Sequence, residues 1–123
     1  MILADTSIWI QHLRSRMSEM EARLRDGQIV MHPFIAAEIS LGSLHNRRER
    51  LAELDALWQV KVAGLDEVRQ MIESHALYSK GIGLTDAHLL ASCLLSPGTR
   101  LWTRDKSLEQ AAQALGVAWA LSP

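Results

Sequence analysis

The chain has very little cysteine. Cys93 is the only one among 123 residues, and it lies in the apolar run from Leu89 to Leu95. A single cysteine excludes an intramolecular disulfide and a CxxC metal knuckle. A reducing environment fits this composition best, and we expect a cytoplasmic protein.

Proline and long hydrophobic runs are also scarce. Three prolines and no tract rich in Ser, Gln or Glu argue against disorder and against a flexible linker. No segment approaches the roughly 20 apolar residues that cross a bilayer. The chain reaches Asp5 before it could form the apolar stretch of a signal peptide. We therefore expect one domain over residues 1–123, neither exported nor inserted into a membrane.

The chain lacks a strong excess of either charge, with 13 Lys and Arg against 14 Asp and Glu. Nucleic-acid binders often have a clear positive excess, which is missing here. If bound cations neutralise four of the acids, 13 basic side chains face 10 acidic ones. The composition therefore permits binding of nucleic acid but does not indicate it.

Apolar periodicity switches repeatedly between short strand-like runs and helical stretches. This alternation is typical of an α/β fold, in which helices flank a parallel sheet. We expect a central parallel sheet of about five strands, at Ile2 to Ala4, Gln28 to Met31, Val60 to Ala63, Leu101 to Thr103 and Val117 to Trp119.

The helical stretches are bounded by capping residues, proline and glycine. The expected helices cover Ser7 to Ile10, Met17 to Leu24, Phe34 to about Leu44, Arg47 to Trp58, Leu65 to a stop at Gly81 and Gly83, Asp86 to Leu95 behind a cap at Thr85, and Asp105 to Leu115. The helix from Asp86 is apolar nearly all round, which predicts burial. The four tryptophans are expected to face the core, at positions 9, 58, 102 and 119.

Three acids, Asp5, Asp86 and Asp105, stand where a strand ends or a helix begins. In open α/β sheets ligands bind at that edge. The alternative for each acid alone is a helix cap, which stabilises a helix by about 1 kcal/mol.

Glu38 differs, because its helix offers only apolar neighbours such as Ile35 and Ile39. A buried carboxylate there needs a cation or an arginine partner. Four carboxylates at one edge would repel one another by a few kcal/mol per close pair. A hard divalent cation, Mg²⁺ or Mn²⁺, would relieve this repulsion, and the lack of histidine ligands disfavours zinc.

Four short motifs carry a resemblance to a known family. They are Asp5-Thr6-Ser7 after the first strand, Ala37-Glu38-Ile39, Thr85-Asp86-Ala87, and Thr103-Arg104-Asp105 after a late strand. Their order and spacing resemble a PIN domain over essentially the whole chain. The short length resembles, more narrowly, the VapC toxins of toxin–antitoxin pairs.

The resemblance implies an endoribonuclease that hydrolyses RNA through water activated by Mg²⁺ or Mn²⁺. It assigns metal binding and catalysis to the four acids, and supporting hydroxyls to Thr103 and to Thr6 or Ser7. It also implies a VapB-like antitoxin partner and a homodimer formed through helices.

Basic residues near the acids are candidates for binding RNA. Lys80, Arg100, Arg104 and Lys106 flank Asp86 and Asp105 in sequence, whereas the run from His45 to Arg50 is better explained as a solvated loop and helix start. The five histidines have no metal-ligand spacing.

Two other functional classes compete with a nuclease. A phosphotransfer domain would explain Asp5 but needs a further acid where Ser7 stands. A non-catalytic PIN-like interaction module would keep the acids only as caps and one ion pair, and it would not be stabilised by divalent ions.

Overall fold

The computed structural model describes residues 1–120 and contains a parallel sheet. Its order is β3-β2-β1-β4, and every neighbouring pair is parallel. The strands are β1 (Ile2–Ala4), β2 (Ile29–Met31), β3 (Trp58–Gln59) and β4 (Arg100–Trp102). The predicted α/β class with a central parallel sheet is confirmed.

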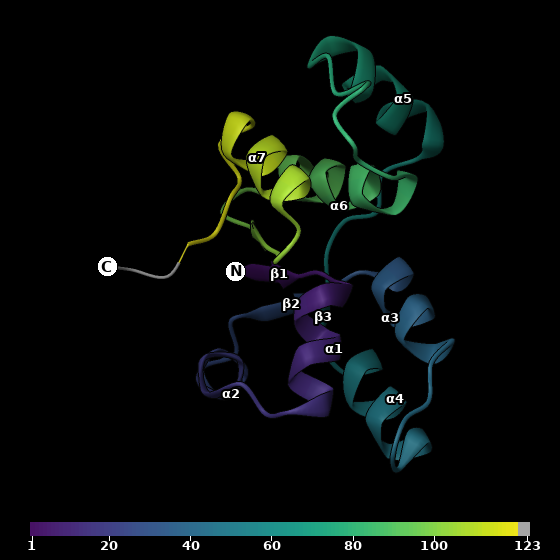
Figure 1. Ribbon diagram of the computed structural model, residues 1–123, viewed down its shortest axis with the longest axis vertical. Helices are drawn as coiled ribbons and strands as arrows, with labels where there is room; N and C mark the ends of the chain where they lie inside the picture. Colours follow the sequence, from purple (N-terminus) through teal and green to yellow (C-terminus); the bar gives the residue numbers. More distant parts are fainter. Residues whose placement is uncertain (121–123) are drawn as a thin grey trace.

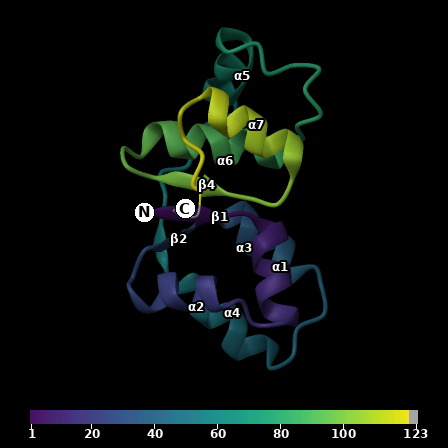
Figure 2. The ribbon, with the colours of Figure 1, turned by 60° about the vertical axis from the view of Figure 1, so that its left-hand side comes forward.

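Helices cover both faces of the sheet, as Figures 1 and 2 show. One face carries α1 (Thr6–Arg14), α2 (Ser18–Arg25), α3 (Pro33–Ser40) and α4 (Arg47–Asp55). The opposite face carries α5 (Leu65–Ser74), α6 (Leu84–Leu95) and α7 (Lys106–Ala114). The sheet is therefore the middle of three layers.

The strand order reverses between β1 and β4. From β1 the chain adds β2 and then β3 on one side, and it returns to place β4 on the other side of β1. Ala4 at the end of β1 pairs with Trp102 at the end of β4, and Asp5 N donates to Trp102 O at 2.9 Å. Ligands of open α/β sheets bind at the carboxyl ends of strands where the order reverses. The end of β1 is therefore the expected place for a site.

The predicted fifth strand is reduced to one bridge. Ala118 forms an isolated parallel bridge with Leu101, because Leu101 N donates to Val117 O and Trp119 N donates to Leu101 O. The segment extends the sheet beyond β4 at a single position. The expectation of about five strands thus corresponds to four strands and this bridge.

The core is built around β1 and α6. Leu3 and Leu90 are fully buried, and every residue of α6 from Ala87 to Cys93 is buried. Burial raises the pKa of the Cys93 thiol to about 12, so the thiol stays protonated and unreactive. The predicted burial of this helix is confirmed.

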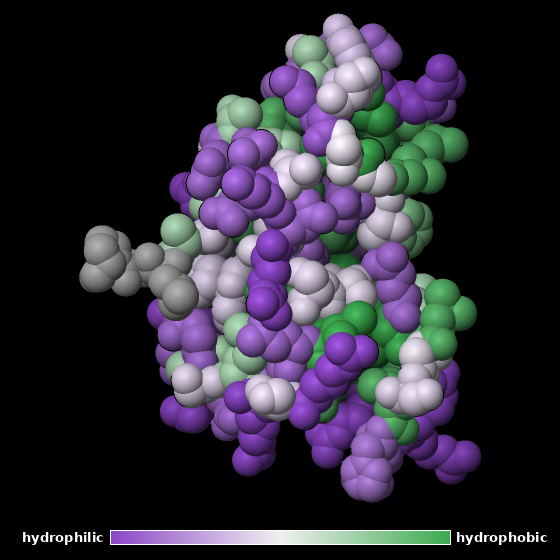
Figure 3. Space-filling view, in the orientation of Figure 1, coloured by the Kyte–Doolittle hydropathy of each residue, from purple (hydrophilic) through white to green (hydrophobic). Residues whose placement is uncertain are grey.

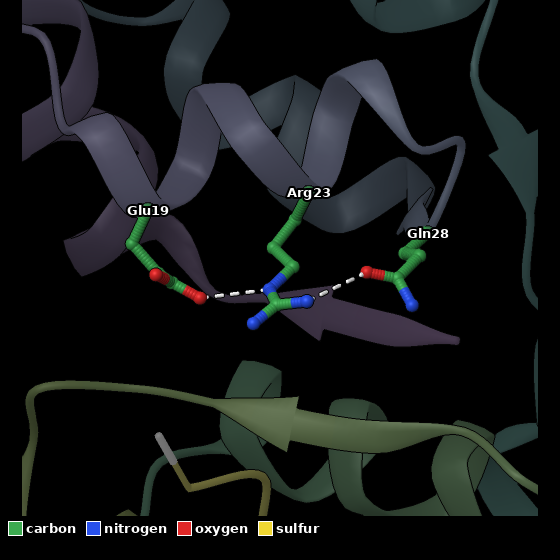
Figure 4. Close-up of polar contacts among 3 residues, drawn as sticks. All are labelled: Glu19, Arg23 and Gln28. Carbon is green, nitrogen blue, oxygen red and sulfur yellow. Dashed lines mark hydrogen bonds and ion pairs between the residues drawn. The ribbon is translucent and has the colours of Figure 1, made fainter. Parts of the chain in front are cut away.

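Polar contacts fasten α2 to the start of β2, as Figure 4 shows. Arg23 Nε donates to Glu19 Oε1 at 2.7 Å, and its Nη1 donates to Gln28 Oε1 at 3.2 Å. The guanidinium also lies 5.7 Å from the ring centroid of Trp119. Arg23 therefore links α2 to the C-terminal part of the core.

The third predicted strand was misplaced. The pairing with β2 begins at Trp58, whereas Val60 and Ala63 are buried in the connection that leads to α5. Trp58 was also expected on the core face of a helix, but α4 ends at Asp55 and Trp58 is 78% exposed on the edge strand. Trp58 has helical spacing from Leu51, but α4 ends before it reaches Trp58.

Helix ends account for the other corrections. α3 ends at Ser40 rather than near Leu44, and Arg47 donates to the carbonyls of Ser40 and Gly42 there. The cap of α6 is Gly83, so Thr85, which was expected to cap it, lies within the first turn.

The helix before it, α5, ends at Ser74 rather than at Gly81 and Gly83. Ala76 adopts a φ of 51°, and Leu77 N donates to Ile72 O at 2.9 Å. These features form a helix C-terminus without glycine. Within residues 1–120, no helix is long and apolar enough to cross a membrane.

Candidate active site

Asp5 is the buried centre of a polar network at the end of β1. Its Oδ1 accepts hydrogen bonds from Ile8 N at 3.2 Å and from Ser7 Oγ at 2.5 Å. Its Oδ2 accepts a hydrogen bond from Thr103 Oγ1. Asp5 therefore caps α1 and is also tied to the segment that follows β4.

The two hydroxyl groups also accept hydrogen bonds from that segment. Thr103 Oγ1 accepts from Asp105 N at 2.9 Å, and Ser7 Oγ accepts from Arg104 N at 3.2 Å. Thr103 and Ser7 thus hold the chain after β4 against Asp5. Both residues were predicted as site hydroxyls, and the structure brings both to Asp5.

Asp105 follows as the cap of α7. Its Oδ1 accepts a hydrogen bond from Leu108 N at 2.9 Å, and the residue is exposed. Because Asp105 N bonds to Thr103 and Thr103 bonds to Asp5, two short polar links connect the two acids. The reversal of strand order therefore brings Asp5 and Asp105 to one place.

Glu38 reaches the same region from α3, which packs against α1. Thr6 Oγ1 donates to Glu38 Oε1 at 2.6 Å. Glu38 is exposed, so the expectation of a carboxylate on a buried apolar face was wrong. Its partner in the described part of the chain is a hydroxyl, and none of the ion pairs there involves it.

Asp86 lies in the first turn of α6 and is partly buried. Burial raises the pKa of its carboxyl above the ordinary value, and the charges of Asp5, Asp105 and, more weakly, Glu38 raise it further. A hydrogen bond from the backbone of Gly83 opposes the shift. Asp86 therefore experiences the negative charge of all three other predicted acids.

The donor set suits a hard divalent cation. It consists of carboxylates with neighbouring hydroxyls, and such oxygen ligands favour Mg²⁺ or Mn²⁺. As the side chains stand, no three acidic, histidine or cysteine side chains within residues 1–120 are close enough together to hold one ion. The chemistry of the group therefore fits a cation, and binding would have to draw the carboxylates together.

Capping and clustering occur together here. Asp5 and Asp105 cap α1 and α7, and Asp86 accepts from the backbone of Gly83, which caps α6. The alternative interpretation as a cap is thus correct for Asp5 and Asp105, whereas Asp86 lies within the first turn of α6 behind the cap residue Gly83. Capping alone does not explain why four acids lie at one edge, where each raises the cost of charging Asp86.

A cleft of about 470 Å³ adjoins Glu38 on the side of α1 and α3. Its lining includes the apolar Ile10 and Ile39 and the charged Arg14 and Arg16. Figure 3 shows hydrophobic surface over the part of the molecule where α1 and α3 lie. Of the four acids, Glu38 lines this cleft, and Asp5, Asp86 and Asp105 do not.

Three of the predicted basic residues lie near the acids. Arg104 and Lys106 flank Asp105 and are exposed, and Lys80 is exposed in the loop before α6. That loop approaches the start of α7, since a Cβ on Gly81 would lie 3.3 Å from Ser107 Oγ.

The fourth, Arg100, was also expected near the acids, and this expectation was wrong. It begins β4, at the opposite end of the strand, and donates to Gly116 O at 2.6 Å.

Histidine takes no part in the acid cluster. His32 and His88 are buried with ring centroids 6.4 Å apart, and His45 belongs to the exposed loop before α4.

The hydrogen bond from Thr6 to Glu38 joins residues 32 positions apart, and no local pattern indicated which hydroxyl Glu38 would meet.

Comparison with known proteins agrees with this arrangement. The family model described as PIN domain matches residues 2–114. The chain is 42% identical over 120 residues to a protein named Ribonuclease VapC32, found in two strains of Mycobacterium tuberculosis, CDC 1551 / Oshkosh and ATCC 25618 / H37Rv. The alignment covers 98% of this chain and 97% of that protein. With its parallel sheet and its acids at the reversal of strand order, the chain belongs to the PIN domain family and, within it, to the VapC proteins.

Proposed function

We propose that this chain is an endoribonuclease toxin that hydrolyses RNA phosphodiester bonds with Mg²⁺ or Mn²⁺ held by Asp5, Glu38, Asp86 and Asp105. The observation that carries the proposal is the meeting of the acids at the carboxyl ends of β1 and β4. Thr103 links Asp5 to Asp105 there, and the charges of the other three acids act on the partly buried Asp86. Carboxylates that repel one another at one site favour binding of a cation, because the cation relieves their repulsion. The name ribonuclease, borne by the VapC32 relatives, supports RNA as the substrate.

The bound cation would supply an activated water molecule and stabilise charge on the phosphate oxygens. The residues of this chain orient its ligands. Ser7 and Thr103 each donate to a different oxygen of Asp5, and Thr6 donates to Glu38. Ser7 and Thr103 are thereby positioning residues, since they fix the direction of a carboxylate.

Arg104, Lys106 and Lys80 are proposed to bind the RNA backbone. Their support is exposure beside the acids and the approach of the Lys80 loop to α7. Cationic side chains there would offset the repulsion between RNA phosphates and the acid cluster. Unpaired or looped RNA is the expected form of the substrate, because its bases and backbone can enter a cleft.

A VapB-like antitoxin is the proposed protein partner, and two copies of this chain are proposed to form a homodimer in the cytoplasm. The names of the VapC relatives support the antitoxin. Exposed apolar side chains on helices and loops, including Leu41, Leu84 and Tyr78, give surface that a partner or a second copy would cover.

A non-catalytic interaction module of the same fold is the second candidate. The caps formed by Asp5 and Asp105 favour it, because a structural role alone would account for them. The two candidates differ in whether purified protein cuts RNA.

The test is cleavage of an end-labelled single-stranded RNA by purified protein with Mg²⁺, with Mn²⁺ and with EDTA. We expect cleavage only with a divalent ion, and a rate at least about 100-fold lower for Asp86→Asn. Products should carry 5′-phosphate and 3′-hydroxyl ends, because water attacks the phosphorus. Asp66→Asn, which removes an exposed acid at the start of α5, is the matched control and should cleave normally.

Cleavage that persists in EDTA, or products that end in 2′,3′-cyclic phosphate, would contradict the metal mechanism. Protein that folds, binds its divalent ion and cuts none of a mixed pool of RNAs would favour the interaction module.

A further inference from the structure

Arg104 is anchored to α1 at both ends of the residue. Its backbone N–H donates to Ser7 Oγ at 3.2 Å, and its guanidinium Nη1 donates to Gln11 Oε1 at 2.6 Å. Ser7 and Gln11 are four residues apart, so they lie on the same face of α1. The side chain of Arg104 therefore runs along the start of α1, beside Asp5.

The guanidinium of Arg104 is held by a neutral partner, although the residue is a neighbour of two of the acids. Asp105 is the next residue, and Ser7 contacts Asp5 directly. Ion pairs in the described chain join Arg16 to Glu21, Arg23 to Glu19 and Arg50 to Glu53, and none reaches Arg104. An arginine held by an amide keeps its whole positive charge, whereas one held by a carboxylate is neutralised.

The guanidinium also keeps most of its hydrogen-bonding capacity. It has five N–H donors, and its bond to Gln11 uses a single nitrogen. The residue is exposed, and among the described residues its guanidinium makes no hydrogen bond other than the one to Gln11. A guanidinium in a fixed orientation with free donors is suited to a phosphate group, which it can bind through two parallel hydrogen bonds.

We propose that Gln11 is a positioning residue that holds Arg104 ready for an RNA phosphate adjacent to the one being cleaved. The inference rests on the proposed function, since the acid cluster with its cation is taken to hold the scissile phosphate. Gln11 supplies orientation and leaves the charge of Arg104 intact. Fixing the side chain before RNA arrives removes part of the entropy cost of binding.

The test measures binding of a fluorescent single-stranded RNA at several salt concentrations. All variants carry Asp86→Asn, so binding is followed without cleavage. Arg104→Ala should weaken binding about tenfold and lower the slope of log affinity against log salt by about 0.7, because one phosphate contact is lost. Gln11→Ala should weaken binding about threefold and leave the slope unchanged, because the charge remains.

Gln11→Glu gives the sharpest arm of the experiment. A carboxylate of nearly the same shape would pair with Arg104, so affinity and slope should both fall to the values of Arg104→Ala. Gln70→Glu adds the same charge on the exposed surface of α5, at the far end of the molecule in Figure 1, and should leave both unchanged. In the Arg104→Ala background, Gln11→Ala should have no further effect.

Kinetics separate this role from a purely structural one. In the protein with Asp86 intact, Gln11→Ala should raise KM and leave kcat unchanged, and its melting temperature should match that of the parent. The inference is overturned if Gln11→Glu binds RNA as the parent does, or if the effects of Gln11→Ala and Arg104→Ala simply add. If the protein cleaves RNA but the Gln11 and Arg104 substitutions act independently, the inference fails and the proposed function stands. If no form of the protein binds RNA, both fail.

Discussion

His32 is a buried histidine that holds the helix carrying Glu38. It follows β2 directly and is fully buried, and its Nδ1 accepts a hydrogen bond from Phe34 N at 2.9 Å, which caps α3. The neutral ring therefore carries its proton on Nε2. Burial, and then the neighbouring His88, lower the pKa of His32 to about 4. No motif predicted this role, because a lone histidine after a strand has no distinctive spacing.

The low pKa of His32 predicts a loss of stability in mild acid. The unfolded chain takes up a proton near pH 6.5 and the folded chain only near pH 4, so stability is full above pH 6.5 and falls as the pH drops between these values. The difference corresponds to about 3 kcal/mol of unfolding free energy. His32→Asn keeps a capping oxygen but removes this titration. In urea unfolding, the difference in unfolding free energy between wild type and His32→Asn should therefore shrink as the pH falls from 7 to 4.5. His45→Asn, at an exposed histidine, should run parallel to wild type, and a constant gap between wild type and His32→Asn would contradict the assignment.

At the scale of elements, the apolar pattern predicted helices better than their ends. The buried α6 was correct because apolar residues occupy nearly every position, and such a helix can only be internal. The end of α5 was wrong because the chain turns at Ala76, with a left-handed φ of 51° where glycine is usual. β3 was misplaced because its paired residues, Trp58 and Gln59, are exposed, whereas the buried Val60 and Ala63 follow the strand. Burial therefore did not identify the paired residues.

The strained turn after α5 predicts a stabilising substitution. Ala76→Gly should raise the free energy of unfolding by about 0.5–1 kcal/mol, because glycine adopts a positive φ without the penalty of a Cβ. Thermal melting measures the change. Ala52→Gly, at an exposed position inside α4, is the matched control and should lower stability by about 1 kcal/mol. If both substitutions destabilise equally, the turn after α5 is not strained.

At the scale of the whole molecule, the order of the strands assembles the site. β1 and β4 are adjacent although 95 residues separate Ala4 from Arg100, and their helices leave toward opposite faces of the sheet. The acids from α3 and α6 then approach from these two faces. Their mutual repulsion destabilises the fold without a cation, and a cation that binds only the folded state would reverse this.

Metal binding therefore predicts a rise in melting temperature. At ten times its dissociation constant, Mg²⁺ or Mn²⁺ should stabilise the fold by about 1.4 kcal/mol, which is about 5 °C for a domain of this size. Asp86→Asn should abolish this rise, and it should raise the melting temperature of the metal-free protein, because the pKa of Asp86 is raised and charging it is costly. Asp66→Asn should respond to the metal as wild type does. An equal response of Asp86→Asn and wild type would place the cation elsewhere.

The sequence by itself determined the class of fold and indicated which acids to expect at one edge of the sheet. Asp5 and Asp105 follow short apolar runs, and a local pattern is enough to place them at strand ends. Only the tertiary structure decided that β4 lies beside β1, that Thr6 meets Glu38, and that Gln11 rather than an acid receives Arg104. The physical reason is distance along the chain: these contacts join residues 32 to 98 positions apart, and local periodicity carries no information about which distant side chains will meet.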